Sequence, residues 1–385
     1  MNRRLEQAQA SVGQGVAAID TPALVIDLDA MERNLARMAA FASGHGLRLR
    51  PHAKMHKSAE LAKRQVAHGA VGVCVQKTDE ALALAHAGVH DIFISNEVIA
   101  PAKLARLAVA LRDLPTRFAI AVDSALGLTR LAQALDAAGV HAPNAIDVFI
   151  EIDVGQGRCG VTPGEAAVAL ARQIAQHPTL RFAGLQAYHG SAQHQRTPAE
   201  RRVAIEGATQ AVVRTRDALA AAGFSVPLVT GAGTGSFVLE AASGVWGELQ
   251  AGSYLFMDAD YAGNQADPEA PAFEHALYVK SQIMSRSEDH AVCDAGHKSH
   301  AIDSGLPTVA WPSGLVFANG GDEHGILRAA APGTALPALG ETVWLIPGHC
   351  DPTVNLHDFA FGVVGGLAAG RVERLIRVDA RAALG

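Results

Sequence analysis

The feature that most constrains this chain is a repeated alternation of short apolar runs and alanine-rich segments between residues 47 and 254. Runs such as "DIFISN", "FAIAVD" and "AIDVFIEID" are typical of buried strands. The segments between them have helix-forming residues, apolar positions three to four apart, and glycine or proline at their ends. Repeated strand–helix units form parallel sheets. Eight candidate strands predict a (β/α)8 TIM-type barrel, although an open doubly wound sheet explains six of them equally well.

The rhythm changes near residue 266. From there onward, short β-type runs such as "GLVFANG", "ETVWLIPGH" and "RVERLIRV" are separated by glycine, proline and aspartate turns, and helical patterns are absent. We therefore predict an N-terminal extension at 1–20, a barrel at 21–265 and a C-terminal all-β domain at 266–385. A further strand at 21–28 fits either domain.

Composition narrows the partners that such a chain can have. The net charge is −6, basic runs are absent and aromatic residues make up only 5% of the chain, all of which argues against a nucleic-acid partner. No stretch approaches the ~18 apolar residues of a membrane span, and the first residues lack the apolar centre of a signal peptide. The four cysteines have no framework spacing, which indicates reduced thiols and a cytoplasmic protein.

The stretch Arg48–Ser58, "RLRPHAKMHKS", concentrates positive charge in an acidic protein. If its first part is a strand, Arg50, His52 and Lys54 share one face, and Lys54 lies at the carboxyl end, where barrel enzymes have their active sites. Neighbouring cations lower the pKa of a lysine and favour the neutral amine, which forms a Schiff base with a cofactor aldehyde. Lys57 follows the strand, and we expect it to face solvent. The alternative is a polar strand end with solvated charges.

Two glycine-containing turns indicate an anion site. "TGAGTGS" (Thr230–Ser236) ends the seventh candidate strand, and "QAGSY" (Gln250–Tyr254) ends the eighth. Glycines let backbone N–H groups converge on an anion, and phosphate sites in barrels often follow these two strands. One such turn is weak evidence, but two at adjacent strands predict a phosphate site. Ordinary loops are the alternative.

Polar residues also follow the fifth and sixth candidate strands. Arg158, in "EIDVGQGRCGV", places a permanent cation where it can contact a ring nitrogen or an anionic substrate. "LQAYHGSAQH" ends the sixth strand with Tyr188, His189 and His194, and one of these histidines is a candidate acid or base. A solvated arginine and structural histidines are the alternative.

The C-terminal domain contains a possible metal pair in "IPGHCDPTVNLHD". On an extended segment, His349 and Asp351 face the same way and Cys350 faces the opposite way. An imidazole and a carboxylate can begin a metal site, but two ligands are too few for a closed structural site, so water or substrate must complete it. On its own, an H-x-D pair is weak evidence for a metal.

Together these motifs resemble the D-threonine aldolase family, whose relatives include D-serine dehydratase and the 3-hydroxyaspartate dehydratases and aldolases. The resemblance extends from "TPALVIDLDAMERN" to "HCDPTVNLHD", and further specific parts are "RPHAKMHKS", "GVCVQK", "ELQAGSYLFMDADY" and "DEHG". It implies the alanine-racemase-like arrangement (fold type III), in which a barrel that binds pyridoxal 5'-phosphate (PLP) is followed by a β domain. It also implies a homodimer.

The resemblance assigns roles residue by residue. Lys54 matches the lysine that holds PLP, and His194 matches the histidine proposed as the base near the substrate hydroxyl. His349 and Asp351 match the metal pair. The remaining matches are cofactor contacts, with Arg158 near the ring, Gln76, Tyr188 and Tyr261 beside the cofactor, and Thr234, Gly252, Ser253 and Tyr254 on the phosphate side.

The implied activity is reversible cleavage of a D-3-hydroxy amino acid, such as D-threonine, D-phenylserine or 3-hydroxy-D-aspartate, to glycine and an aldehyde. The related dehydratases have cysteine where Asp351 stands, and a carboxylate suits manganese or magnesium better than zinc. This favours an aldolase over a dehydratase. A racemase, a non-catalytic PLP-homeostasis protein and a metal-dependent hydrolase are the remaining alternatives, and each leaves the β domain, the metal pair or Lys54 without a role.

Overall fold

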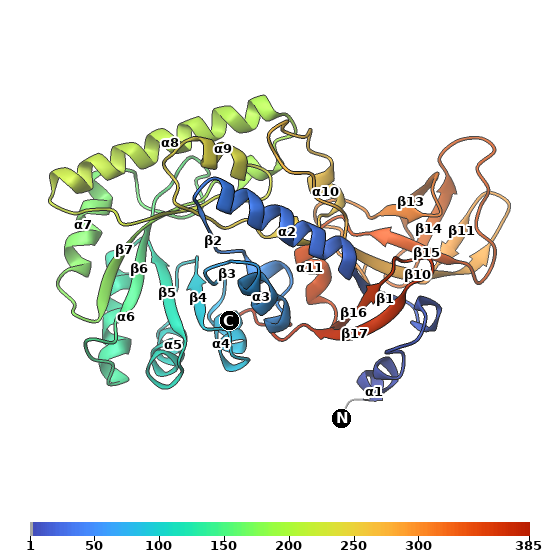
Figure 1. The fold of residues 1–385 in the computed structure, drawn as a ribbon, viewed down its shortest axis with the longest axis horizontal. Coiled ribbons are helices and arrows are strands. Elements are labelled where there is room, and N and C mark those ends of the chain that lie inside the picture. Colours follow the sequence, from blue (N-terminus) through green and yellow to red (C-terminus); the bar gives the residue numbers. More distant parts are fainter. Residues whose placement is uncertain (1–2) are drawn as a thin grey trace.

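The structure is a computed structural model that describes residues 3–385, with side chains from residue 5 onward. It has two parts that lie side by side, a barrel and a C-terminal β domain (Figure 1). A short helix α1 (Arg3–Gln9) and a 3-10 turn η1 (Val16–Ala18) precede both of them. Within the described residues, no helix is both long and apolar enough to cross a membrane.

The barrel is a curled sheet of eight parallel strands in the order β2-β9-β8-β7-β6-β5-β4-β3. A parallel bridge between His52 and Cys74 joins the two ends of this order, so the sheet closes. The predicted barrel is therefore confirmed, and the open doubly wound sheet is not what forms. The strands are β2 (Arg48–Leu49), β3 (Val73–Val75), β4 (Asp91–Ile94), β5 (Arg117–Val122), β6 (Ile146–Glu151), β7 (Leu180–Ala187), β8 (Val229–Gly231) and β9 (Glu248–Leu249).

Helices connect these strands and cover the barrel. Their apolar faces pack against one side of each strand, while residues of the other side, including Cys74, Phe93 and Phe149, fill the barrel interior. Because both faces of each strand are buried, the strand sequences are continuous apolar runs. The helices are α2 (Leu28–Gly44), α3 (Ala59–Ala67), α4 (Thr78–His86), α5 (Pro101–Asp113), α6 (Ala125–Ala137), α7 (Glu165–Ile174), α8 (Pro198–Ala221), α9 (Phe237–Ala242) and α10 (Ala259–Ala262), with 3-10 turns η2 (Ala53–Met55), η3 (Ser191–His194) and η4 (Ser253–Leu255).

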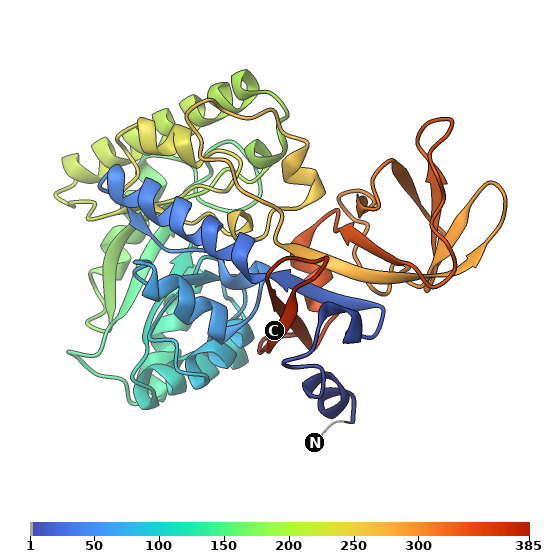
Figure 2. The same cartoon turned by 45° about the vertical axis from the view of Figure 1, so that its right-hand side comes forward.

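The β domain is built on a nine-stranded mixed sheet. Strand β1 (Ala23–Asp27) lies in this sheet, antiparallel to β10 and parallel to β16 (Figure 2), although α2 directly after it packs on the barrel. The chain thus passes through the β domain before it enters the barrel, and it later returns to the β domain. The other strands are β10 (Leu277–Arg286), β11 (Ala291–Cys293), β12 (Thr308–Trp311), β13 (Leu315–Asn319), β14 (Gly325–Ala329), β15 (Thr342–Ile346), β16 (Phe359–Val364) and β17 (Arg371–Arg377).

One helix interrupts the β domain where the sequence predicts none. Helix α11 (Cys350–Asn355) lies between the sheet and the barrel, next to η2 (Figure 1). Asp258, at the start of α10 in the barrel, accepts a hydrogen bond from the backbone N–H of Cys350 at 3.0 Å. A carboxylate at the first turn of a helix satisfies a backbone donor that has no partner within the helix. The position of α11 therefore depends on a contact from the other domain.

Candidate active site

A cavity of about 210 Å³ lies at the carboxyl ends of the barrel strands. Its lining comes from segments that follow or end β2, β3, β4, β6, β7, β8 and β9, and from Asp351 of the β domain. In a (β/α)8 barrel this end is where catalytic residues gather, because it is where many strand-to-helix loops meet. The cavity therefore has the position expected of an active site, with the β domain as one of its walls.

Lys54 reaches this cavity from a 3-10 turn and not from a strand. Strand β2 ends at Leu49, and His52 caps the turn Ala53–Met55 by accepting a hydrogen bond from the backbone N–H of Lys54 at 3.3 Å. Pro51 interrupts the ladder because it has no N–H to donate. The predicted alternation of Arg50, His52 and Lys54 along a strand is therefore wrong beyond the first residues, although Lys54 still points into the cavity.

The positive charges around Lys54 are neutralised by acidic partners. Arg50 is buried and pairs with Glu248 at 3.1 Å and with Asp91. Lys57 is also buried, and its Nζ lies 3.0 Å from the Glu80 carboxylate. The expectation that Lys57 faces solvent is wrong, because Glu80 of α4 provides a buried ionic partner for its amine.

The pKa of Lys54 is raised, not lowered. Its Nζ lies 2.7 Å from Asp351 Oδ2, and the attraction of this carboxylate outweighs the effect of burial. The sequence-based expectation of a lowered pKa is wrong because the opposing charge comes from a residue almost 300 positions later. Burial acting alone would raise the pKa of Asp351, but Lys54 and His349 hold it below its ordinary value.

The two glycine-containing turns form one edge of the cavity. Within the described residues, the backbone N–H groups of Gly233, Thr234 and Gly252 have no protein acceptor. A side chain at Gly252 would place its Cβ 2.8 Å from the carbonyl oxygen of His52, so glycine is required for the two strand ends to come this close. Thr234 Oγ1 accepts a hydrogen bond from the backbone N–H of Tyr254 at 3.0 Å and holds the turns together. Backbone N–H groups without an acceptor at the edge of a cavity suit a phosphate.

Polar side chains fill the rest of the barrel wall. The Arg158 guanidinium lies 5.6 Å from the centre of the Tyr188 ring, within cation–π distance. The Gln76 amide nitrogen lies 2.9 Å from His52 Nε2. Burial lowers the pKa of His52 far below its ordinary value, so this imidazole is neutral.

His349 and Asp351 come together at the start of α11. His349 caps the helix, Asp351 lies in its first turn, and His349 Nε2 is 3.8 Å from Asp351 Oδ1. The prediction that an extended segment places them on one face is wrong, but the first turn of a helix also brings residues two apart close together here. Asp351 Oδ1 is buried and has no hydrogen-bond partner among the described residues. A buried carboxylate oxygen without a donor, facing an imidazole nitrogen, suits a cation.

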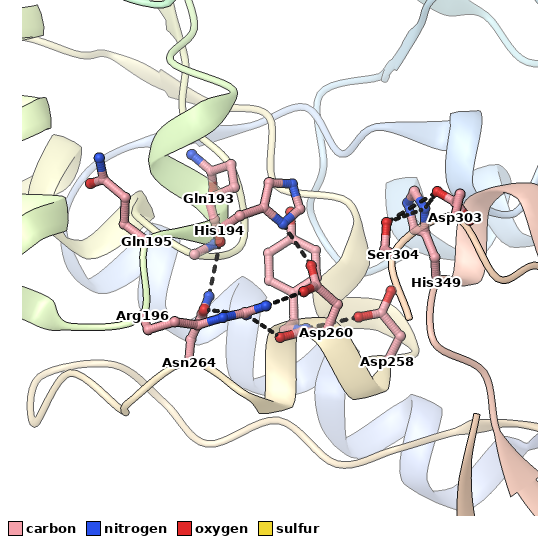
Figure 3. A network of polar contacts seen from close by, with 12 residues as sticks. Gln193, His194, Gln195, Arg196, Asp258, Asp260, Asn264, Asp303, Ser304 and His349 are labelled. Atoms are coloured by element: carbon pink, nitrogen blue, oxygen red, sulfur yellow. Dashed lines mark hydrogen bonds and ion pairs between the residues drawn. The ribbon is translucent and has the colours of Figure 1, made fainter. Parts of the chain in front are cut away.

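His194 lies at the rim of the site, at the end of η3. Its Nδ1 is 2.6 Å from Asp260 Oδ2 (Figure 3). Its ring centre is 5.8 Å from that of Tyr261, which lines the cavity. Asp260 also pairs with Arg196. Burial would raise the pKa of Asp260, but Arg196 and His194 hold it below its ordinary value, so this carboxylate is ionised.

A larger hollow of about 740 Å³ lies elsewhere, on the β domain. It is lined mainly by apolar side chains, including Trp311 and Trp344, and its one amine belongs to Lys280. Lys280 Nζ donates to the backbone carbonyls of Val16 and Ile19 at 3.1 and 2.6 Å. The one amine of this hollow is therefore already engaged, and the smaller barrel cavity is the better candidate.

Known proteins are similar to this chain in both domains and over nearly its whole length. The family model described as alanine racemase, N-terminal domain, matches residues 26–260, and a serine dehydratase domain matches residues 276–363. A D-threonine aldolase from Arthrobacter sp is 45% identical over 373 residues, 97% of this chain and 95% of the relative. A 3-hydroxy-D-aspartate aldolase from Paracoccus denitrificans is 41% identical over 96% of this chain and 94% of the relative. The crystal structure of D-threonine aldolase from Filomicrobium marinum superposes with a TM-score of 0.92, at 47% identity, covering 96% of this chain and 98% of that one.

This chain belongs to the D-threonine aldolase and 3-hydroxy-D-aspartate aldolase family. Most of the site residues that its motifs single out line the cavity, namely Lys54, Gln76, Arg158, Tyr188, Thr234, Gly252, Ser253, Tyr261 and Asp351. Three do not line it. His194 and His349 lie beside it, as described above, while the Tyr254 side chain is fully buried and its hydroxyl accepts a hydrogen bond from Gln65 at 3.3 Å.

Ser95, Gln186 and Gln250 also line the cavity, although none of them was among the predicted site residues. Ser95 follows β4, and its hydroxyl lies 3.2 Å from His52 Nε2. Gln186 and Gln250 bond to each other across the cavity floor, at 2.8 Å from Gln250 Nε2 to Gln186 Oε1. Each stands at or just beyond the carboxyl end of a barrel strand, and this position is the signal that would have found them.

Proposed function

We propose that this protein is an aldolase that cleaves D-3-hydroxy amino acids to glycine and an aldehyde, using PLP and a divalent cation. The observation that carries the proposal is the 2.7 Å contact between Lys54 and Asp351, which brings a candidate cofactor lysine and a candidate metal ligand into one cavity. They belong to different domains, so the site needs both. The aldolases among its relatives support this reaction over the other chemistries of the same fold.

The barrel wall suits PLP in shape and in charge. Lys54 would bind the cofactor covalently, the N–H groups of Gly233, Thr234 and Gly252 would bind its phosphate, and Arg158 would lie near its ring nitrogen. Gln76, Ser253, Tyr188 and Tyr261 would complete the contacts. When bound, PLP supplies the electron sink that accepts the electron pair of the broken bond.

The β-domain wall suits a divalent cation. His349 Nε2 and Asp351 Oδ1 face each other with no competing hydrogen bond within the described residues, and no group of three or more potential ligands occurs there. Water or the substrate would have to fill the remaining positions. A nitrogen and a carboxylate oxygen suit manganese or magnesium, and such a cation would make a nearby hydroxyl more acidic.

The chain itself provides a base for the substrate hydroxyl. Because Asp260 engages His194 Nδ1, the other ring nitrogen, Nε2, is left free to accept a proton. We assign to it the proton of the 3-hydroxyl. As that proton leaves, the oxygen electron pair forms the aldehyde carbonyl, the Cα–Cβ bond breaks, and a later proton at Cα gives glycine.

Product analysis tests the proposal directly. The purified protein, loaded with PLP and supplied with manganese or magnesium, is incubated separately with D-threonine, D-phenylserine and 3-hydroxy-D-aspartate. We expect equal amounts of glycine and an aldehyde from at least one of them. Ammonia and a keto acid would instead identify a dehydratase of the same family, and no product from any of them would contradict the assignment.

Two further expectations accompany this function. We infer a homodimer, since the resemblance to the alanine-racemase arrangement implies one, and light scattering of the holoenzyme measures it. We also infer a cytoplasmic location, because all four cysteines are free.

A further inference from the structure

The segment 302–305, "IDSG", has no role in the function proposed above, yet it lies against a candidate metal ligand. Asp303 Oδ2 is 2.7 Å from His349 Nδ1, and Ser304 Oγ is 3.3 Å from the same nitrogen (Figure 3). The Ser304 hydroxyl also donates to Asp303 Oδ2 at 3.0 Å. Two side-chain oxygen atoms thus lie against Nδ1 of the His349 imidazole.

This contact determines which ring nitrogen of His349 is free. A neutral imidazole carries one proton, and a carboxylate on Nδ1 places the proton there. The lone pair is then on Nε2, the nitrogen that lies 3.8 Å from the unpartnered Oδ1 of Asp351. Both possible ligand atoms therefore have an electron pair available for a cation.

The loop that carries Asp303 is held to α11 by contacts of its own. The backbone N–H of Ala301 donates to Thr353 Oγ1 at 3.0 Å, and the Thr353 hydroxyl donates to the carbonyl of His349 at 2.7 Å. Gly348 allows the loop to approach, because a Cβ at this position would lie 2.1 Å from the carbonyl oxygen of Gly305. The placement of Asp303 beside His349 thus follows from the backbone as well as from the side chain.

We propose that Asp303 is a positioning residue, which holds His349 in the tautomer and orientation needed to bind the cation. This inference rests on the metal site of the proposed function and deepens it. Partners that donate or accept at the second nitrogen of a ligating histidine typically change metal affinity by ~10–100-fold when they are removed.

Direct metal binding tests the role of Asp303. Mn²⁺ is titrated into the metal-stripped, PLP-loaded protein and the binding is followed by calorimetry and by the loss of the free-ion EPR signal. We expect D303N to weaken Mn²⁺ binding ~10–100-fold, with the visible absorbance of bound PLP unchanged. D303E, which keeps the carboxylate, should bind Mn²⁺ more tightly than D303N.

A matched control exists in the same domain. Asp289 Oδ1 lies 2.8 Å from His290 Nδ1 in an exposed pair, so D289N removes a similar carboxylate–histidine contact away from the cavity and should leave Mn²⁺ affinity unchanged.

H349A tests the metal site itself and should abolish Mn²⁺ binding. If H349A abolishes binding but D303N binds as the wild type does, or D303E is no better than D303N, Asp303 does not position the ligand. If H349A binds Mn²⁺ normally, the proposed metal site is wrong and the role of Asp303 falls with it.

Discussion

The two walls of the cavity are built in different ways. The barrel wall takes one or two residues from each of many strand ends, including Lys54, Arg158 and Thr234, on a scaffold whose backbone is fixed by parallel pairing. The β-domain wall consists of the first turn of one short helix, with His349 and Asp351. The barrel wall therefore collects its residues from many loops on one scaffold, whereas the β-domain wall depends on how one helix docks.

This difference suggests a division of the chemistry. Under the proposed function, the barrel would provide the amine, the ring cation and the backbone donors for a large anionic cofactor, and the β domain would provide two atoms for a cation. Each wall also has a histidine held by a carboxylate, His194 by Asp260 and His349 by Asp303. The predictions below change one wall at a time, so that cofactor binding, metal binding and proton transfer can be separated.

The largest effect should come from the barrel amine. Lys54→Ala removes the only group proposed to bind PLP covalently, so the visible absorbance of lysine-bound cofactor and the aldolase activity should both disappear. Spectroscopy and glycine release measure these two losses. Lys63→Ala, at an exposed lysine of α3, is the control and should behave as the wild type. An unchanged absorbance in Lys54→Ala would remove this residue from its role.

On the β-domain wall, Asp351→Asn should suppress cleavage while PLP stays attached. The amide keeps the shape of the side chain but loses the charge that a divalent cation needs. Activity is measured with and without added Mn²⁺, and chelation of the wild type should reproduce the loss. Full turnover in a sample shown to be metal-free would mean that cleavage needs no cation at the β-domain wall, which would contradict the proposed division between the two walls.

A smaller effect is expected at the proposed base. His194→Gln should lower kcat by ~10²–10⁴-fold, the usual contribution of a general base, without changing PLP absorbance or Mn²⁺ affinity. His141→Gln, at an exposed loop histidine, is the control. A variant with normal kcat would exclude His194 as the base, and one with lost Mn²⁺ binding would place it on the metal side instead.

The smallest effect on chemistry should come from the second lysine. Lys57→Met leaves Glu80 buried without its partner and should lower the free energy of unfolding by about 3 kcal/mol, while the folded protein keeps its PLP absorbance. Denaturant titration measures the change. Lys298→Met breaks an exposed pair with Glu323 and should leave stability almost unchanged. Loss of covalent PLP in folded Lys57→Met would mean that the two lysines are not separate in function.

Much of the barrel wall was predictable because its signals are local. The glycine-containing turns after the last two barrel strands and Lys54 after the first barrel strand were found from short stretches of sequence, and the closed eight-stranded sheet confirms the predicted fold. The errors have the same origin. Lys57 was expected in solvent because Glu80, its buried partner, lies on α4, beyond the next helix and strand of the chain, and local sequence says nothing of that contact.

The β-domain wall was less accessible to prediction. The H-x-D spacing identified His349 and Asp351, but not the helix that carries them, because its first turn is held by Asp258 from the barrel. Asp260 and Asp303 escaped notice for a similar reason, since each contacts its histidine across more than 40 residues of chain.

The order of strands and helices, the glycines that expose backbone donors and the choice of lysine and histidine are all encoded in short stretches, because periodicity, turn geometry and side-chain chemistry act over a few residues. The charge state of Lys54 and the facing of the two candidate metal ligands follow instead from the docking of two domains. Electrostatic attraction falls with distance and grows with burial, so it depends on which groups packing brings within a few ångströms, and here Asp351 comes from the far end of the chain.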